Sequence, residues 1–193
     1  MSILSALTGG FKSPSSIKHN GKRLPEILES HTRFVRGDST GVRADLSGAN
    51  LSRADLYQMN LALVNFQGAN LEGANLREAK LGSADLSKAN LRKADLRKVD
   101  GTETNFSGAD LTGAQLGGAE LFRADLSGAD LRGADCGATN FRDANVQGAR
   151  FAGASLKTAI LRETKLDGVD LSGVDLSTTL LPRGYKAPVA SRN

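Results

Sequence analysis

The sequence has few of the residues on which most catalytic and metal sites depend. Its 193 residues include no tryptophan, two histidines, one cysteine and four prolines, and aromatic residues make up only 5%. A single cysteine excludes an internal disulfide, and no pair of histidine and cysteine residues has zinc-ligand spacing. No apolar run approaches the ~20 residues of a membrane span, and residues 1–11 lack the basic leader of a secretory signal. These absences favour a cytoplasmic protein without a metal, a cofactor or a disulfide framework.

What the sequence has instead is a period of five. A large apolar residue recurs at every fifth position from Leu46 to Leu181, and among these central positions only Gly101 and Cys136 are not Leu, Phe or Val. A small residue stands two places before each centre, and Asp or Asn usually stands just before it, as in ADLSG at 44–48. A period of five fits neither an α-helix nor a flat strand. The chain must therefore turn by a fixed angle every five residues, so that each centre returns to one interior, where Cys136 is expected to be a structural thiol.

The glycines indicate that four repeats make one coil. If the repeats are assigned to four sides in turn, the second residue after the centre is Gly at eleven of fourteen positions on two sides. On the other two sides it is Gly only at Gly118. Gly easily adopts the positive φ that the third residue of a type II turn requires. The pattern predicts stacked coils of twenty residues, with type II turns on two sides and a different turn type on the others.

The repeats match a known motif, A(D/N)LXX. It occurs as ANLSR at 49–53, ADLSK at 84–88 and ADLRG at 129–133, and over residues 41–181 the chain resembles the pentapeptide-repeat family. The resemblance implies an all-β fold: a right-handed quadrilateral parallel β-helix, a solenoid of about seven coils. At about 4.8 Å per coil the rod would be ~34 Å long. Family members include DNA-imitating gyrase inhibitors, proteins of cell differentiation and effectors, so the resemblance leaves function open.

The segment before the repeats predicts an N-terminal capping α-helix. Residues 24–35 follow a 3.6-residue period, Pro25 suits the first helical turn and Gly37 suits the end. The first coil would otherwise expose its core and its unpaired strand edges. Bacterial members of the family that this chain resembles carry similar helix lids. The face expected to cover the coil comprises Leu24, Ile27, Leu28, His31, Phe34 and Val35.

The chain is thus expected to have four parts. These are a flexible basic segment (1–23), the capping helix and its connector (24–40), the β-helix (41–181) and a C-terminal tail (182–193). The β-helix holds 16 Lys and Arg against 18 Asp and Glu, so the overall net charge of +4 comes from the ends. Such a rod is not a strongly acidic DNA mimic, and direct nucleic-acid binding is not expected. Residues 1–23 also contain apolar residues beside lysines (Ile3, Leu4, Leu7, Phe11), which leaves contact with an anionic membrane open.

Two clusters on the surface depart from the repeat. The basic cluster comprises Arg77, Lys88, Arg92, Lys93, Arg97 and Lys98. It is either a solvated face with ion pairs or a docking patch for an acidic partner. The apolar cluster comprises Leu63, Phe122, Ile160 and Leu180 on the fourth side. Its cover is either the tail, through Tyr185 and Val189, or a second copy bound at the C-terminal end. Gly101 is expected to leave a void, a bulge or a kink.

No catalytic constellation accompanies these clusters. The recurrent Asp residues are explained by bonds from their side chains to backbone N–H groups at the bends, and a convex rod lacks a desolvated pocket. The sequence therefore favours a non-enzymatic scaffold or protein-binding module with an unidentified protein partner and no cofactor. One alternative is a DNA-mimic modulator of a type II topoisomerase (gyrase). A weaker one is a peripheral membrane adaptor that acts through residues 1–23.

Overall fold

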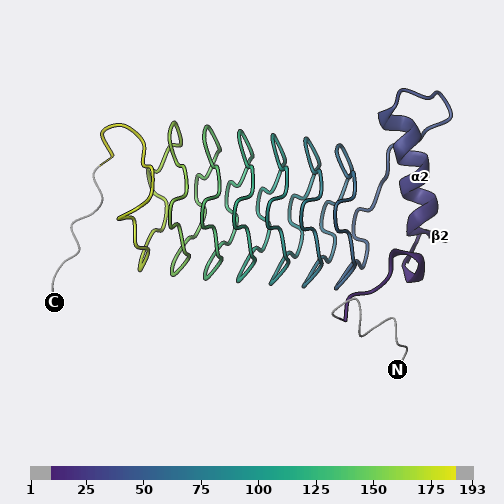
Figure 1. Cartoon of the computed structure of the whole chain (residues 1–193), viewed down its shortest axis with the longest axis horizontal. Helices are drawn as coiled ribbons and strands as arrows, with labels where there is room; N and C mark the ends of the chain where they lie inside the picture. The colour runs from purple at the N-terminus through teal and green to yellow at the C-terminus, as the bar shows by residue number, and fades with distance from the viewer. Residues whose placement is uncertain (1–9, 186–193) are drawn as a thin grey trace.

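A parallel backbone bridge recurs every twenty residues in the computed structural model of this chain, which describes residues 10–185. Asp45 pairs with Asn65, Asn65 with Asp85 and Asp85 with Asn105, and equivalent bridges begin at Asn50 and at later repeats. Figure 1 shows the resulting coils stacked along the length of the molecule, with the helix α2 (Leu24–Val35) upright at the N-terminal end. Twenty residues hold four repeats, so each coil has four sides. The twenty-residue coil predicted from the glycines is confirmed.

Each side ends in a β-turn that starts at the central residue. The N–H of Ala49, for example, donates to the carbonyl of Leu46 over 3.1 Å. The third residue of the turn has a positive φ on all four sides of the first coil: +63° at Gly48, +57° at Arg53, +55° at Gln58 and +66° at Leu63. The predicted change of turn type on the glycine-poor sides is therefore wrong. Bonds between coils hold the same turn there, because the N–H of this third residue donates to the next coil whether it is Gly or not.

The recurrent Asp and Asn residues shape these bends. Asp45 Oδ1 accepts the Ser47 N–H at 3.0 Å, and Asn70 Oδ1 accepts the Glu72 N–H at 3.1 Å. The same side chains also join neighbouring coils, as when Asn65 Nδ2 donates to Asp45 Oδ1 at 2.9 Å. Their expected structural role is confirmed. A short acceptor is required because the bonded N–H lies only two residues further along the chain.

The interior is a single column of apolar side chains. Central leucines such as Leu71 and Leu111 are fully buried together with the alanines two residues before each centre. Each burial contributes roughly 1.5–3 kcal/mol before conformational entropy is counted. Three threonines replace buried alanines, and their hydroxyls are satisfied within the core: Thr104 donates to Leu81, Thr139 to Leu116 and Thr164 to Phe141, over 2.7–2.8 Å.

Gly101 does not interrupt the rod. Its N–H still donates to Glu120 at 2.8 Å, and Asp100 beside it still bridges Glu120, so the expected bulge or kink is wrong. A Cβ at Gly101 would lie 2.7 Å from Leu121 Cδ2. Leu121 of the next coil therefore occupies the space that a side chain at Gly101 would need.

The segment before α2 packs on the first coil. Lys12 forms a parallel bridge with Ala54, its N–H donates to Arg53 at 2.6 Å and its carbonyl accepts from Asp55 at 2.9 Å. The 3₁₀ turn η1 (Pro14–Ser16) and the antiparallel strands β1 (Lys18–His19) and β2 (Lys22–Arg23) follow. The sequence predicts a flexible segment here, whereas the structure gives residues 10–23 these contacts, with Ile17 buried among the core residues. Residues 1–9 lie outside the described part.

Helix α2 ends in a glycine C-cap. Gly37 has φ +78°, its N–H donates to Phe34 at 2.9 Å, and the next N–H, of Asp38, donates to Arg33 at 3.0 Å. These two bonds form a Schellman motif, as the predicted stop at Gly37 requires. The connector, which in the structure comprises residues 36–43, then folds back so closely that a Cβ at Gly41 would overlap the backbone of Phe34.

Four residues of the predicted face of α2 meet the rod, and two do not. Leu24 and His31 are buried, and Ile27 and Leu28 are partly buried against the core. Phe34 and Val35 are 36% and 38% exposed. Their assignment to the buried face is wrong, because the last turn of the helix lies against the connector rather than over the coil interior.

The rod is less well covered at its other end. The central residues Leu171, Leu176 and Leu181 are only partly buried, whereas those of the middle coils are fully buried. Tyr185 packs partly against this end of the core. Residues 186–193, which include Val189 of the predicted tail contact, lie outside the described part.

Candidate functional site

The residues with nucleophilic or acid–base chemistry mostly serve the fold. Cys136 is fully buried, and desolvation raises the pKa of its thiol well above the ordinary value, so the thiolate is strongly disfavoured. Within residues 10–185 there is no group of three His, Cys, Asp or Glu side chains arranged to hold a metal ion. No helix in that part is long and apolar enough to cross a membrane.

His31 joins α2 to the first coil as a neutral imidazole. The backbone N–H of Ala44 donates to Nδ1 at 3.1 Å, so Nε2 carries the proton and donates to the Ala62 carbonyl at 2.8 Å. Desolvation lowers the pKa of His31 below its ordinary value of 6.5, the bond to Ala62 opposes this shift, and the charge of Arg43 adds to it. Stacking on Phe34, with ring centroids 5.9 Å apart, completes the contact.

All residues of the basic cluster except Arg77 lie on the third coil, residues 84–103, around three of its successive corners. Lys88, Lys93 and Lys98, here called the lysine collar, each occupy the third position of a turn with φ of +55° to +57°. The next coil carries Gly at the three equivalent corners. A Cβ on any of these glycines would lie 3.7 Å from the Cγ of the lysine before it. The aliphatic stems of the lysines therefore lie beside bare backbone, and their ammonium groups extend from the corners into solvent.

The arginines of the cluster are paired, whereas two of the lysines are not. Arg97 binds Asp95 through Nε and Nη2, Arg92 reaches Asp110 at 3.2 Å, and Arg77 contacts Glu78 at 3.5 Å. Lys88 and Lys93 have no ion pair within the described residues. A hydrogen bond from Gln58 lowers the pKa of Glu78, and the charges of Arg77 and Lys98 lower it further. The available positive charge is thus that of the lysines.

The apolar cluster does not form one surface. Ile160 and Leu180 are bridged partners on neighbouring coils, as their twenty-residue separation predicts, and Leu180 is 44% exposed. Phe122 lies under Arg123, whose guanidinium is 4.8 Å from the ring centre. Leu63 lies three coils from Phe122, beside Arg43 of the connector, whose Nε donates to the Leu63 carbonyl. The four residues are therefore spread along the rod rather than gathered in one continuous surface, and an interface through all of them stays a prediction.

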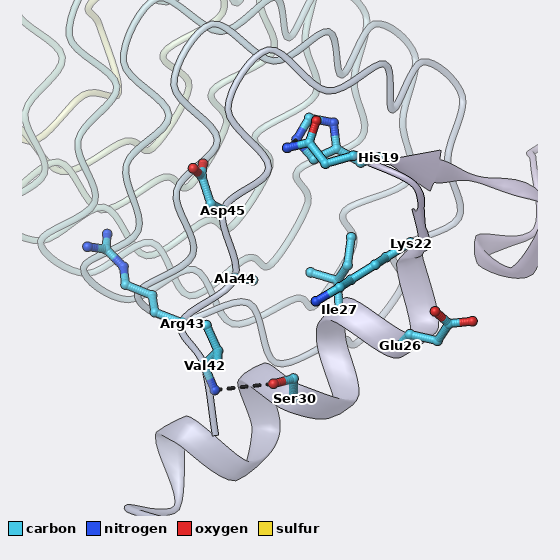
Figure 2. A pocket seen from close by; sticks show the side chains of 10 residues that line it. His19, Lys22, Glu26, Ile27, Ser30, Val42, Arg43, Ala44 and Asp45 are labelled. Atoms are coloured by element: carbon cyan, nitrogen blue, oxygen red, sulfur yellow. Dashed lines mark hydrogen bonds between the residues drawn. The ribbon is translucent and has the colours of Figure 1, made fainter. Parts of the chain in front are cut away.

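A cleft that sequence patterns did not reveal lies between the N-terminal elements and the first coil. Its volume is about 210 Å³, and its lining comes from the β1–β2 hairpin, α2, the connector and the start of the first coil (Figure 2): His19, Asn20, Lys22, Glu26, Ile27, Ser30, Val42, Arg43, Ala44 and Asp45. No motif marks these residues, since they are separated in sequence and meet only when α2 packs on the coil. Val42, 65% exposed, was the one signal available: an apolar residue between polar ones just before the first repeat.

Comparison with known proteins identifies relatives of this repeat. The family described as pentapeptide repeats matches residues 42–77, 79–118, 102–135, 119–157 and 139–177. HetL, a pentapeptide repeat protein involved in heterocyst differentiation regulation in the cyanobacterium Nostoc sp. strain PCC 7120, is 34% identical; 75% of this chain and 73% of that chain are covered, with a TM-score of 0.49. The pentapeptide repeat protein alr5209 of Nostoc PCC 7120 is 31% identical, with 58% and 77% covered and a TM-score of 0.45.

A more distant structure is that of QnrB1, a plasmid-mediated fluoroquinolone resistance protein. It is 18% identical, with 69% of this chain and 89% of that chain covered and a TM-score of 0.46. No curated sequence matches the chain.

Proposed function

The chain belongs to the pentapeptide-repeat family, and from this premise we propose that it is a non-enzymatic binding module whose third coil docks an acidic surface of a protein partner. The observation that carries the proposal is the lysine collar. It places three cationic side chains on adjacent corners of one coil, where Lys88 and Lys93 have no ion pair within residues 10–185 and the arginines between them do.

The rigidity of the collar supports this role. Each lysine corner donates its backbone N–H to the next coil, as Lys88 does to Ser107 at 2.9 Å and Lys93 does to Thr112 at 3.1 Å. A partner therefore meets charges at defined positions and orders little backbone on binding. Two adjacent corners are also the two edges of one flat side of the rod. An acidic surface that lies on this side can contact the lysines at both edges. Such charge complementarity raises association rates and discriminates against basic partners.

Charge reversal of the collar tests the proposal. The variant carries Lys88→Glu, Lys93→Glu and Lys98→Glu, and Glu is suited to these corners because Glu78, Glu103 and Glu163 adopt the same positive φ. A matched control reverses Arg142, Lys157 and Arg162 on the later coils. In pull-downs from the native host, quantified by mass spectrometry, an acidic partner retained by the wild type and the control is expected to be lost by the collar variant. Equal recovery by all three proteins would contradict the proposal.

Several finer assignments belong to the same proposal. We infer that residues 44–183 form seven right-handed coils, that α2 caps the first of them through His31, and that the protein acts in the cytoplasm as a scaffold. The half-buried last coil supports a homodimer through the C-terminal end, which light scattering with size exclusion tests directly.

Each of the two alternative functions is tested by a separate experiment. A gyrase supercoiling assay tests modulation of a topoisomerase, and the mixed charge of the rod gives it no specific support. Membrane attachment is best tested by liposome flotation after deletion of residues 1–9 alone, because residues 10–23 contact the first coil and their loss would disturb the fold.

A further inference from the structure

We propose that the cleft between α2 and the first coil is a second, independent docking site, which binds an acidic peptide segment of a protein partner by one large apolar side chain. The site does not share residues with the lysine collar. It lies at the N-terminal end of the rod, between the connector and the strands β1 and β2 (Figure 2).

The size and lining of the cleft suit one side chain. Its volume of about 210 Å³ is smaller than the pockets that enclose drug-sized ligands, which usually exceed ~300 Å³. Ile27, Val42 and Ala44 supply apolar lining from the helix, the connector and the first coil. An aliphatic or aromatic side chain placed there would be removed from water on several sides.

Val42 is the residue that most clearly indicates a contact surface for a partner. It is 65% exposed, whereas the other exposed large apolar residues of the described chain range from 36% to 44%. The residue is nevertheless held in place, since its N–H donates to both the carbonyl and the hydroxyl of Ser30 at 3.2 Å. The Val42–Ser30 contact is drawn in Figure 2. A fixed, exposed apolar side chain beside a cleft is a preorganised contact for a partner.

Leu63 is a second exposed apolar residue of the first coil. The connector continues the coil register, so that Arg43 lies one coil before Leu63 and its Nε donates to the Leu63 carbonyl. Leu63 is 39% exposed and has φ +66°, a conformation that is costly for a branched side chain. Polar residues occupy the other corners with positive φ on this side. A strained, exposed leucine at this one corner fits a role in contact rather than in folding.

The charges around the cleft favour an acidic occupant. Figure 2 shows the Lys22 side chain extending past Ile27, with Glu26 directed to the opposite side of the helix. Lys22 has no ion pair within the described residues, and the other carboxylate of the lining, Asp45, already accepts bonds from Ser47 and Asn65. Residues 10–43 hold seven Lys and Arg against three Asp and Glu. A peptide with carboxylates around its apolar anchor would complement this end.

A phage-displayed library of random dodecapeptides, selected on the full-length protein, provides the probe. The enriched peptides are expected to share one large apolar residue flanked by Asp or Glu. Val42→Ser and Lys22→Glu should each raise the Kd of the best peptide by about tenfold or more. The controls Val35→Ser on α2 and Lys18→Glu on β1, which lie outside the lining, should leave the Kd unchanged, as should reversal of the lysine collar. Val42 is largely exposed, so its variant is expected to keep the wild-type Tm.

Other results would overturn the proposal. Enriched peptides without the expected pattern, or equal binding to all variants, would show that the cleft is not the site. Loss of binding only on reversal of the collar would assign the peptides to the third coil. A dimer that Val42→Ser dissociates in light scattering would identify a second copy as the occupant. Binding to phosphatidylserine vesicles that Val42→Ser abolishes would identify a lipid surface instead.

Discussion

The two ends of the rod differ in how deeply their central residues are buried. At the N-terminal end, residues of α2 and Ile17 pack against the core, and the central residues Leu46 and Leu51 are as buried as those in the middle. At the C-terminal end, Leu171 and Leu176 are only partly buried within the described chain. The repeat itself is the same at both ends. A solenoid therefore buries its core through its neighbours, and a terminal coil needs a covering element that the repeat cannot supply.

The largest expected effect compares the same substitution in the middle and at the C-terminal end. Leu116 and Leu176 are centres on one side of the rod, three coils apart. Leu116→Ala removes a fully buried side chain and should lower the free energy of unfolding by about 2–5 kcal/mol. Leu176→Ala should cost roughly 1 kcal/mol, because its side chain is already partly hydrated. Urea titration followed by circular dichroism measures both, and equal losses would show that the last coil is covered as tightly as the middle.

The N-terminal end of the rod should lose local stability in mild acid because of His31. Burial lowers the pKa of His31, so the stability that it contributes is fully present above the unfolded value of about 6.5 and is lost as the pH falls through the lower folded value. Protonation of Nδ1 breaks its bond to the Ala44 N–H. Hydrogen exchange at the Ala44 amide should therefore accelerate between pH 7.5 and pH 5 relative to amides of the middle coils.

The expected change for this contact is about 1–3 kcal/mol of local stability. His31→Gln should abolish the pH dependence between pH 7.5 and pH 5, whereas His19→Gln, on strand β1, should preserve it. If exchange of the Ala44 amide accelerates equally in His31→Gln, the pH dependence arises from carboxylates and not from His31.

Glycine-rich and glycine-poor corners allow a smaller, paired test. Ala138 has φ +55°, so Ala138→Gly should relieve strain and raise the free energy of unfolding by about 0.5–1 kcal/mol. Gly128 has φ +64° and open space where a Cβ would stand, so Gly128→Ala should lower it by a similar amount through backbone strain alone. Thermal unfolding of both variants checks the signs. A stabilised Gly128→Ala would show that the hydrogen bonds between coils remove the conformational penalty.

The smallest expected effect concerns the lysine collar. Reversal of Lys88, Lys93 and Lys98 should change the free energy of unfolding by less than about 0.5 kcal/mol per residue, because their ammonium groups lie in solvent at the corners. The same denaturant titration applies. A large loss of stability would mean that the collar serves the fold rather than a partner.

Much of the fold was predictable because a five-residue repeat admits few solutions. The buried centres, the twenty-residue coil, the role of Asp and Asn at the bends and the helix at 24–35 all follow from local patterns. The turn type did not, since Arg53 and Leu63 adopt a conformation that bonds between coils impose against their own preference. The exposure of Phe34 was also missed, because helical periodicity locates a face but not the point at which the rod beneath it ends.

The candidate sites were likewise predictable only in part. Lys88, Lys93 and Lys98 could be assigned to one coil from spacing alone. That Arg92 and Arg97 form ion pairs, whereas Lys88 and Lys93 form none within residues 10–185, depends on how the side chains lie in the fold. The cleft at Val42 could not be anticipated, since it is formed by segments without a shared period.

The amino-acid sequence by itself determined which side chains point inward, because large apolar residues at every fifth position are buried together only if each of them faces the interior. Tertiary structure alone decided which corners carry usable charge, how each end is covered and that Val42 and Ile27 line one cleft. Those features depend on distances between segments remote in sequence, and such distances are set by packing and by hydrogen bonds between coils rather than by any local preference.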